Sequence, residues 1–536
     1  MSIRNDRSQV NPWLVLAVMC LGLFMTLLDT TIVNIAIPSI IDGLDASLDE
    51  ILWVINAYVL VFAVLLITAG RLGDILGPKR LFLVGMAVFT LASAFCRLAQ
   101  DPAQLITARA LQGVGGAMLS PQMLAVTTSL FPPERRGVAF AIPGAVAGLA
   151  VAIGPTLGGF LVTHFGWPSI FYVNVPVGIA ALVLTLLIVP DLRPGRRHRL
   201  DLLGVLLASA SLFGITFGLI EGERYDWGRV ISFFTIPGII IAGIVLMLIF
   251  LLTQYLRQQK EPLLPFAIFR DRNYSLMTLV VAATSFAVLG LFLPLTIYLQ
   301  SVLGLTALEA GLTLLPQALI SMLIAGPAGG LTDRFGGKYI LVGGLSLFAS
   351  GMGYIDWVAQ ANSGGWSFLP GLILAGVGLG FTWAPLYNVA MRDIDSQVAG
   401  VAAGVFSTIQ EMGGVIAGAA VGALLQNRLA AAIQDEATQR AGQLPPEFRD
   451  RFVDGFKQAT QGGLEVGANG TGGGAEAMPG VPAQVAQQMQ RLAEEVFKHG
   501  FVDAMHPTLL LPIAVALLAA MSCLAIKRRK YRGEAA

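Results

Sequence analysis

The chain reads Gly70-Arg-Leu-Gly-Asp-Ile-Leu-Gly-Pro-Lys-Arg80 between two long apolar runs. A related stretch, Gly329-Gly-Leu-Thr-Asp-Arg-Phe-Gly-Gly-Lys-Tyr339, again separates two apolar runs. Glycines at matching places suit a chain that turns tightly and lets helix backbones approach closely. Because the same turn occurs twice, the sequence predicts that the two halves of the chain share one architecture.

Each copy of this turn also carries an acid beside bases. Asp74 and Asp333 lie near expected helix ends, where each can hold a charged latch that forms and breaks. A positively charged loop without such a role is the alternative, and the repetition argues against it. The candidate gate residues are Gly70, Gly73, Asp74, Gly77, Arg80, Asp333, Arg334 and Gly336.

The composition is that of an integral membrane protein. Hydrophobic residues make up 55% and charged residues 12% of the chain, and the mean hydropathy is +0.73. No Gly-x-x-x-x-Gly-Lys-Ser/Thr stretch is present, so we expect no ATPase in this chain, and any pumping draws on an ion gradient or a partner. The cysteines fall inside apolar runs, so we expect no disulfide framework and no metal site. The first run lacks a small-residue cleavage site, which favours a retained helix.

A transmembrane helix needs about 20 mostly apolar residues, and fourteen stretches meet this criterion. They are 13–36, 51–72, 80–99, 102–124, 138–163, 167–189, 201–221, 233–256, 274–300, 308–331, 339–360, 367–391, 399–426 and 507–526. The predicted fold class is therefore an all-α integral membrane protein with fourteen transmembrane helices.

Arginine and lysine gather in one set of loops, which places both termini in the cytoplasm. That set holds Arg4, Arg7, the 70–80 turn, Arg135, Arg136, the 193–199 and 257–272 clusters, Arg334, Lys338, Arg392 and the 527–532 tail. The short loops of the other set hold Arg97, Arg224 and Arg229.

The two turns follow the second and the tenth span in the same orientation. Around each turn, six spans form one six-helix bundle. The two bundles are related by a pseudo-twofold axis along the membrane normal. We expect an N-terminal bundle at 1–190, a linker with two inserted helices at 191–272, and a C-terminal bundle at 273–536.

The segment 427–506 is the one long external stretch between spans. Its parts 428–441, 446–460 and 483–503 show apolar residues at helical spacing, while 462–480 is glycine-rich. It is either a lid or a contact for lipid or an envelope protein, or else a tolerated insertion, which we favour.

Three ionisable residues lie deep inside spans, where their cost makes each a functional hypothesis. They are Asp29, Arg109 and Glu411. A carboxylate in a low-dielectric cavity is able to bind and release a proton, and a nearby arginine can drive that proton off. Structural pairing is the alternative for Asp29 and Arg109, and direct binding of a cationic substrate is the alternative for Glu411.

Two further groups of residues point to movement and to a cavity. The stretch Gly154-Pro-Thr-Leu-Gly-Gly159 combines a proline that permits a bend with glycines that allow close packing, either as a hinge or as a plain interface. Aromatic and amide groups are expected to line a cavity for a bulky apolar ligand, although many of them suit packing as well. The candidate cavity residues are Asn34, Trp53, Tyr58, Gln112, Phe286, Phe292, Trp383, Tyr387 and Asn388.

These stretches together resemble the fourteen-helix drug:proton antiporters of the major facilitator superfamily. The 70–80 turn resembles the family's gating loop, and Leu28–Pro38 resembles its first-helix signature. The stretch from Arg109 to Ala117 resembles the motif whose arginine is implicated in proton transfer, and Gly154, Pro155, Gly158 and Gly159 resemble the antiporter motif.

The chain departs from this family pattern in four places. Alanine stands at Ala141 and Ala150 where the pattern has glycine, and Trp167-Pro-Ser169 replaces Trp-Arg-Trp. Gln410 stands where an arginine is frequent, which leaves Glu411 more available for protons or cations. The 427–506 segment is longer than the minimal plan.

The resemblance implies proton-coupled efflux of amphipathic drugs or antibiotics by alternating access across a bacterial cytoplasmic membrane. The expected partners are the drug, protons and membrane lipids, without nucleic acid, and no cofactor is expected beyond the proton gradient. The rivals are a lipid or lysolipid translocase, suggested by the 427–506 segment, and a non-transporting membrane sensor, which the buried charges argue against.

Overall fold

The computed structural model describes residues 11–132, 135–191, 200–222, 224–225, 227–231, 234–258, 262–395, 398–461 and 483–527. The first half contains α1 (Pro12–Leu44), α2 (Leu48–Leu76), α3 (Pro78–Leu98), α4 (Pro102–Leu130), α5 (Arg136–Phe165), α6 (Ser169–Tyr172) and α7 (Asn174–Ile188). Next come α8 (Leu202–Ile220), the hairpin strands β1 (Arg229–Ile231) and β2 (Phe234–Thr235), and α9 (Ile236–Leu256).

The second half begins with a short helix, η2 (Phe266–Arg270). It continues with α10 (Arg272–Ile297), η3 (Tyr298–Val302), α11 (Ala307–Phe335), α12 (Lys338–Val358), η4 (Gly365–Phe368), α13 (Leu369–Met391), α14 (Ala399–Ala441), α15 (Pro446–Gln461) and α16 (Ala483–Cys523).

Each of the fourteen predicted spans coincides with helical structure. Within the described residues, 12 helices are long and apolar enough to cross a membrane. The other two predicted spans correspond to α4 and α5, with 29 and 30 residues. Helix α4 is less apolar because it carries Arg109 and Gln112. The expected span 167–189 is broken into α6 and α7 at Val173.

The second helix of each half begins with the same capping box. The backbone N–H of Ser47 donates to Glu50 at the start of α2, and that of Thr306 donates to Glu309 at the start of α11, both at 2.9 Å. Each hydroxyl in return accepts from the backbone N–H of its glutamate. Because helix starts leave N–H groups unpaired, this reciprocal bonding fixes where both helices begin.

The same two helices end on glycine in the left-handed region. Gly77 has a φ of 93° after α2, and Gly336 has a φ of 82° after α11. This backbone conformation strains other residues, which explains why the doubled turn places glycine there. The turn end of the molecule is defined here as the end that holds Gly77, Gly336, Met391 and Lys527.

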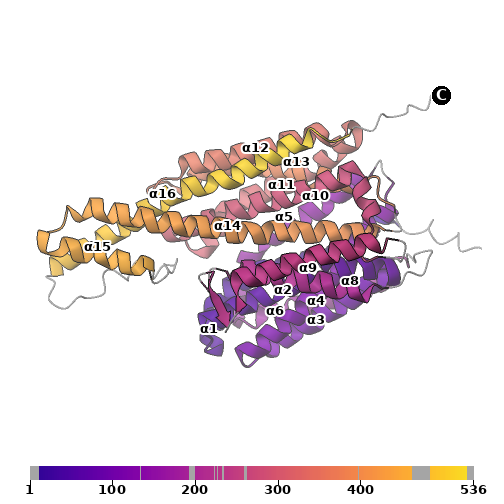
Figure 1. The fold of residues 1–536 in the computed structure, drawn as a ribbon, viewed down its shortest axis with the longest axis horizontal. Coiled ribbons are helices and arrows are strands. Elements are labelled where there is room, and N and C mark those ends of the chain that lie inside the picture. Colours follow the sequence, from indigo (N-terminus) through magenta and orange to yellow (C-terminus); the bar gives the residue numbers. More distant parts are fainter. Residues whose placement is uncertain are drawn as a thin grey trace, which may run out of the picture.

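The two bundles show matching helix contacts (Figure 1). In the first, α2 packs on α4, α3 on α4, α1 on α5, and α3 on α7. In the second, α11 packs on α13, α12 on α13, α10 on α14, and α12 on α16. Between the bundles, α2 packs against α14 and α11 against α5, which is the same contact with the halves exchanged. This exchange symmetry is the pseudo-twofold relation that the sequence predicts.

The inserted pair α8–α9 lies beside the contact between the bundles. Helix α8 packs on α9 and touches both α2 and α14. At its end, Glu221 accepts hydrogen bonds from Asn56 of α2 and from Arg224, both at 3.1 Å. Thr216 donates to the sulfur of Met412 on α14 at 3.4 Å. The pair therefore contacts each bundle.

Helix α14 runs the length of the molecule, and α15 and the first part of α16 lie beside its far portion (Figure 1). We call residues 427–461 and 483–506 the extension. Its core includes Leu429, Ile433, Phe452, Val496 and Phe501, and this core is continuous with that of the second bundle. The expected helical parts are present: 428–441 continues α14, 446–460 forms α15, and 483–503 belongs to α16. The glycine-rich part lies outside the described residues.

Candidate functional site

A cavity of about 360 Å³ lies between the two bundles. Helices α1, α2, α4 and α5 supply one side, and α10, α11, α13 and α14 supply the other. The lining is mostly apolar, with a few polar groups, as is usual for sites that take small organic molecules. The polar lining residues are Thr26, Ser120, Gln317, Ser321, Tyr387, Ser407, Gln410 and Glu411.

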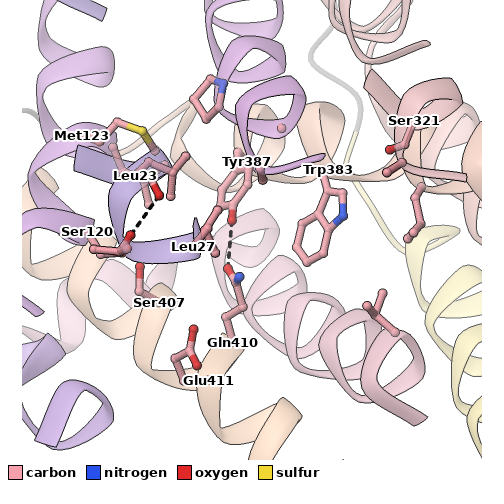
Figure 2. A pocket seen from close by; sticks show the side chains of 18 of the residues that line it. Leu23, Leu27, Ser120, Met123, Ser321, Trp383, Tyr387, Ser407, Gln410 and Glu411 are labelled. Atoms are coloured by element: carbon pink, nitrogen blue, oxygen red, sulfur yellow. Dashed lines mark hydrogen bonds between the residues drawn. The ribbon is translucent and has the colours of Figure 1, made fainter. Parts of the chain in front are cut away.

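Two aromatic rings of α13 line this cavity. Trp383 and Tyr387 stack with ring centroids 6.1 Å apart, because they are one helical turn apart. The Tyr387 hydroxyl donates to Gln410 Oε1 at 2.8 Å, and Figure 2 shows this bond beside Glu411. The cavity thus offers a flat apolar surface close to a carboxyl group.

Glu411 of α14 lines the cavity. Among the described residues, none donates a hydrogen bond to Glu411 and none forms an ion pair with it. An unpaired carboxylate in a mostly apolar cavity is costly unless it takes up a proton or meets a cation. A carboxyl group in this setting favours either a bound proton or a neighbouring positive charge.

Asp29 lies elsewhere, in the interior of the first bundle, and does not line the cavity. Its carboxylate forms a salt bridge with Arg109 of α4. It also accepts hydrogen bonds from Gln112 Nε2 at 2.7 Å and from Asn174 Nδ2 of α7 at 3.0 Å. The structure thus brings Asp29 and Arg109 together and pairs both charges, as buried charges require.

Arg109 also contacts an aromatic side chain that lies between this buried network and the cavity. Its Nε donates to Val54 O at 3.1 Å, and its Nη1 donates to Gln112 Oε1 at 2.6 Å. Its guanidinium lies over the Tyr58 ring, 4.5 Å from the centroid. Tyr58 stacks on Phe62, which lines the cavity. One aromatic side chain therefore separates the network from the cavity wall.

Several residues expected in the cavity lie outside it. Phe292, Trp383 and Tyr387 line it, whereas Trp53, Tyr58, Gln112, Phe286 and Asn388 do not. Trp53 packs on Phe217 of α8, and Asn388 donates to Asp333. Tyr58 and Gln112 are held by Arg109. The side chain of Asn34 lies outside the described residues.

Asp74 joins the two bundles at the turn end. Its carboxylate accepts from the backbone N–H groups of Gly400 and Val401, at 2.8 Å each, and so caps the start of α14. A negative charge is favoured there by the unpaired N–H groups and the helix dipole. Gly70 makes this contact close, since a Cβ on it would lie 2.3 Å from the Gly400 oxygen.

A second set of bonds closes the turn end on the other side of the pseudo-twofold axis. Asp333 of α11 accepts from the Val138 backbone N–H of α5 at 3.3 Å. Arg136 Nη1 donates to the carbonyl oxygens of Met391 and Arg392 at 3.2 and 3.1 Å. Asp74 and Asp333, the acids of the repeated turns, therefore each bond to the opposite bundle.

The other residues expected in the gate contact groups of their own half of the chain. Gly73 gives room to Gln122, whose Oε1 would lie 2.1 Å from a Cβ there. Arg80 forms an exposed 3.7 Å ion pair with Asp191, and the Arg334 guanidinium lies over the ring of its neighbour Phe335.

The 154–159 stretch packs α5 against α1. A Cβ on Gly154 would lie 2.1 Å from Thr31 Oγ1, and a Cβ on Gly158 would lie 2.8 Å from Ile32. Gly159 has open space within 4 Å. The side chain of Pro155 lies outside the described residues. Two of the three glycines are thus required by the close approach of these helices.

Several residues of the site were not singled out in the sequence, among them Asn174, Gln317 and Arg136. Asn174 bonds Asp29, Gln317 lines the cavity, and Arg136 bridges the bundles. The signal for the first two is an amide inside an apolar run, beside Pro176 and Pro316 respectively. Arg136 is indistinguishable from other loop cations until the partner helix is placed.

Comparison with known proteins gives consistent matches. The sequence pattern of the Major Facilitator Superfamily matches residues 19–418. An uncharacterized MFS-type transporter of Mycobacterium tuberculosis is 38% identical, over 84% of this chain and 78% of its own length. The tetracenomycin C resistance and export protein of Streptomyces glaucescens is 37% identical, over 79% and 78%. The puromycin resistance protein of Streptomyces alboniger is 35% identical, over 80% and 85%.

Solved structures show the same fold. A human organic anion transporter aligns with a TM-score of 0.55 at 14% identity, over 78% of this chain and 94% of that one. A proton:xylose symporter aligns with a TM-score of 0.55 at 13% identity, over 76% and 87%.

Proposed function

Since this chain belongs to the Major Facilitator Superfamily of secondary transporters, we propose that it exports amphipathic drugs or antibiotics in exchange for protons by alternating access. The observation that carries this proposal is the unpaired Glu411 in a cavity between two bundles. Relatives that confer resistance to tetracenomycin C and puromycin support drugs as the substrates.

The proposed orientation places the turn end in the cytoplasm. Basic residues gather at that end, while short loops at the opposite end hold few. The bonds from Asp74, Asp333 and Arg136 close the turn end in this structure. On this orientation, the structure corresponds to the carrier closed toward the cytoplasm, with both termini cytoplasmic in a bacterial cytoplasmic membrane.

Opening toward the cytoplasm then requires these inter-bundle bonds to break. The bundles 1–190 and 273–536 are proposed to rock as units, and 191–272 accompanies them. The turn end is also held by close glycine contacts and by a buried apolar cluster that includes Phe131, Phe140, Met391 and Phe406, so these contacts must separate as well. The 154–159 stretch, packed tightly on α1, is the proposed hinge element.

Proton coupling is proposed to use both carboxylates. A cationic substrate binds ionised Glu411, and protonation of Glu411 from outside removes that attraction. Protonation of Asp29 would weaken its pairing with Arg109 and loosen α1 from α4 and α7. Tyr58, which lies under the Arg109 guanidinium and stacks on Phe62 of the cavity wall, lies between the two sites.

The test is proton flux in proteoliposomes that contain a pH-sensitive dye. Puromycin is the first candidate drug, because a relative confers resistance to it. Wild type should release protons on drug addition, and Glu411→Gln and Asp29→Asn should each abolish this release. The control is Glu309→Gln, which changes an acid that caps α11 away from the cavity.

The variants separate the outcomes. Loss in Glu411→Gln alone assigns the coupling proton to Glu411 and removes Asp29 from the mechanism. Substrate transport without proton movement in wild type contradicts antiport. Movement of labelled lipid, with no response to any drug, replaces the proposal with a lipid translocase.

A further inference from the structure

Gln317 of α11 is a buried amide that the proposed cycle leaves without a role. The residue is among those that line the cavity, and it is only 2% exposed. Neither Oε1 nor Nε2 has a hydrogen-bond partner among the described residues. Both a donor and an acceptor are therefore unsatisfied at the wall of a cavity.

The packing of α13 holds Gln317 in this position. A Cβ on Gly376 would lie 2.6 Å from the Gln317 carbonyl oxygen, and one on Gly380 would lie 2.9 Å from that of Ser321. The two glycines let α13 approach the backbone of α11 at both residues. Gln317 and Ser321, one turn apart, thus line the cavity as a polar pair on a fixed helix face.

The other glutamines of the cavity and of the Asp29 network each have a protein partner. Gln410 Oε1 accepts from the Tyr387 hydroxyl, and Gln112 bonds Asp29, Arg109 and Ser93. A buried amide without partners is disfavoured relative to methionine, which has a similar volume and no such need. An unpaired amide at a ligand cavity is explained if the ligand supplies the missing donor and acceptor.

We propose that Gln317, assisted by Ser321, hydrogen-bonds a neutral group of the substrate that presents both a donor and an acceptor, such as a carboxamide. This inference rests on the proposed function. It adds Gln317 to Glu411 as a second group that recognises the substrate. Figure 2 shows Ser321 and Glu411 on opposite sides of Trp383 and Tyr387. The preferred substrate therefore carries a cation at one end, a carboxamide or similar group at the other, and an aromatic ring between them.

A matched pair of compounds tests this assignment on the purified full-length protein. One is para-carbamoylbenzyl trimethylammonium, and the other is para-isopropenylbenzyl trimethylammonium, which has the same shape without the amide. Equilibrium binding of each is measured for wild type, Gln317→Met, Glu411→Gln and the control Gln104→Met, which changes an exposed glutamine at the start of α4, away from the cavity.

Wild type should bind the carboxamide about tenfold or more tightly than its isostere, since a site with unpaired polar groups rejects the ligand that leaves them unpaired. Gln317→Met should remove this preference by weakening carboxamide binding alone. Gln104→Met should keep the preference, and Glu411→Gln should weaken both compounds equally.

The binding results distinguish failure of the Gln317 assignment from failure of the proposed drug export. Equal binding of both compounds to wild type, with the Glu411→Gln effect retained, overturns the Gln317 assignment alone. Absence of binding of either compound overturns it together with cation export. Thermal unfolding gives a separate check, because Gln317→Met removes no protein hydrogen bond and should unfold no earlier than wild type. Earlier unfolding would assign Gln317 a structural bond and overturn the proposal.

Discussion

Gly70→Ala is expected to separate the two bundles at the turn end. A Cβ on Gly70 would lie 2.3 Å from the carbonyl oxygen of Gly400 and 3.0 Å from Cα of Gly404. Both are backbone atoms, so α2 and α14 would have to move apart by roughly 1 Å to reach an ordinary contact. Such overpacking costs about 1–3 kcal/mol, which lowers the ratio of closed to open molecules by about 5- to 150-fold.

Distances between spin labels on the two bundles measure this shift. Leu187 near the end of α7 and Phe335 at the end of α11 are suitable, because they are 77% and 65% exposed at the turn end. The labels are attached after replacement of the three native cysteines by alanine. Gly70→Ala should reduce the population at the short distance and increase one at a longer distance.

The matched control is Gly326→Ala on α11, where a Cβ would have open space within 4 Å. It should leave the distance distribution unchanged. If Gly70→Ala also leaves the distribution unchanged while the protein remains folded, the contact between α2 and α14 does not hold the turn end closed.

Three further changes have defined outcomes. Asp29→Asn leaves the buried Arg109 without a counter-charge, which should lower unfolding stability by about 3–5 kcal/mol; addition of Arg109→Gln should recover part of this loss in thermal melts, and an unchanged single-variant melt contradicts the pairing. Asp74→Ala removes two bonds from the start of α14 and should cost the closed state about 1–2 kcal/mol, so the same label distances should lengthen; unaltered distances contradict this role. Phe452→Ala empties a core site of the extension at a cost of about 3–5 kcal/mol; hydrogen exchange in α15 should accelerate, and exchange at the wild-type rate would show that α15 is not held by this packing.

The spans and the twofold plan could be predicted from the sequence because the membrane imposes them. A run of apolar residues has few alternatives in a bilayer, where the backbone must bond to itself. The glycines of the repeated turn could be predicted as well, because Gly77 and Gly336 adopt a backbone conformation that favours glycine. The capping boxes at Ser47 and Thr306 can also be recognised in the sequence. Only the structure shows that they begin equivalent helices of the two bundles.

The lining of the cavity was less predictable, since the sequence does not show which face of a helix meets the other bundle. Arg109 and Gln112 are three residues apart and share one face of α4. That face turns inward to Asp29, and so Gln112 and Tyr58 lie in the first bundle instead of the cavity. Gln317 could not be predicted as a site residue, because a single amide in an apolar run forms no distinguishing pattern.

The continuation of α14 beyond the last apolar residues was also missed. The membrane criterion ends the span at 426, where polar residues begin, although nothing there stops a helix. Leu425, Leu429, Ile433, Ala437 and Ala441 recur every four residues and are buried in one core. This spacing is that of a helix packed along one face, and it crosses the expected boundary without interruption.

The length of α14 makes it a lever arm. Its 43 residues span about 64 Å, roughly twice the hydrocarbon thickness of a bilayer. It starts at the Asp74 latch, passes the cavity at Glu411 and ends outside the apolar zone. Each degree of tilt about its first residue would displace its last residue by about 1.1 Å. A fluorophore near Ala441 would therefore magnify small rotations of α14 about its contact with Asp74, and a single labelled helix would report the proposed transport cycle in real time.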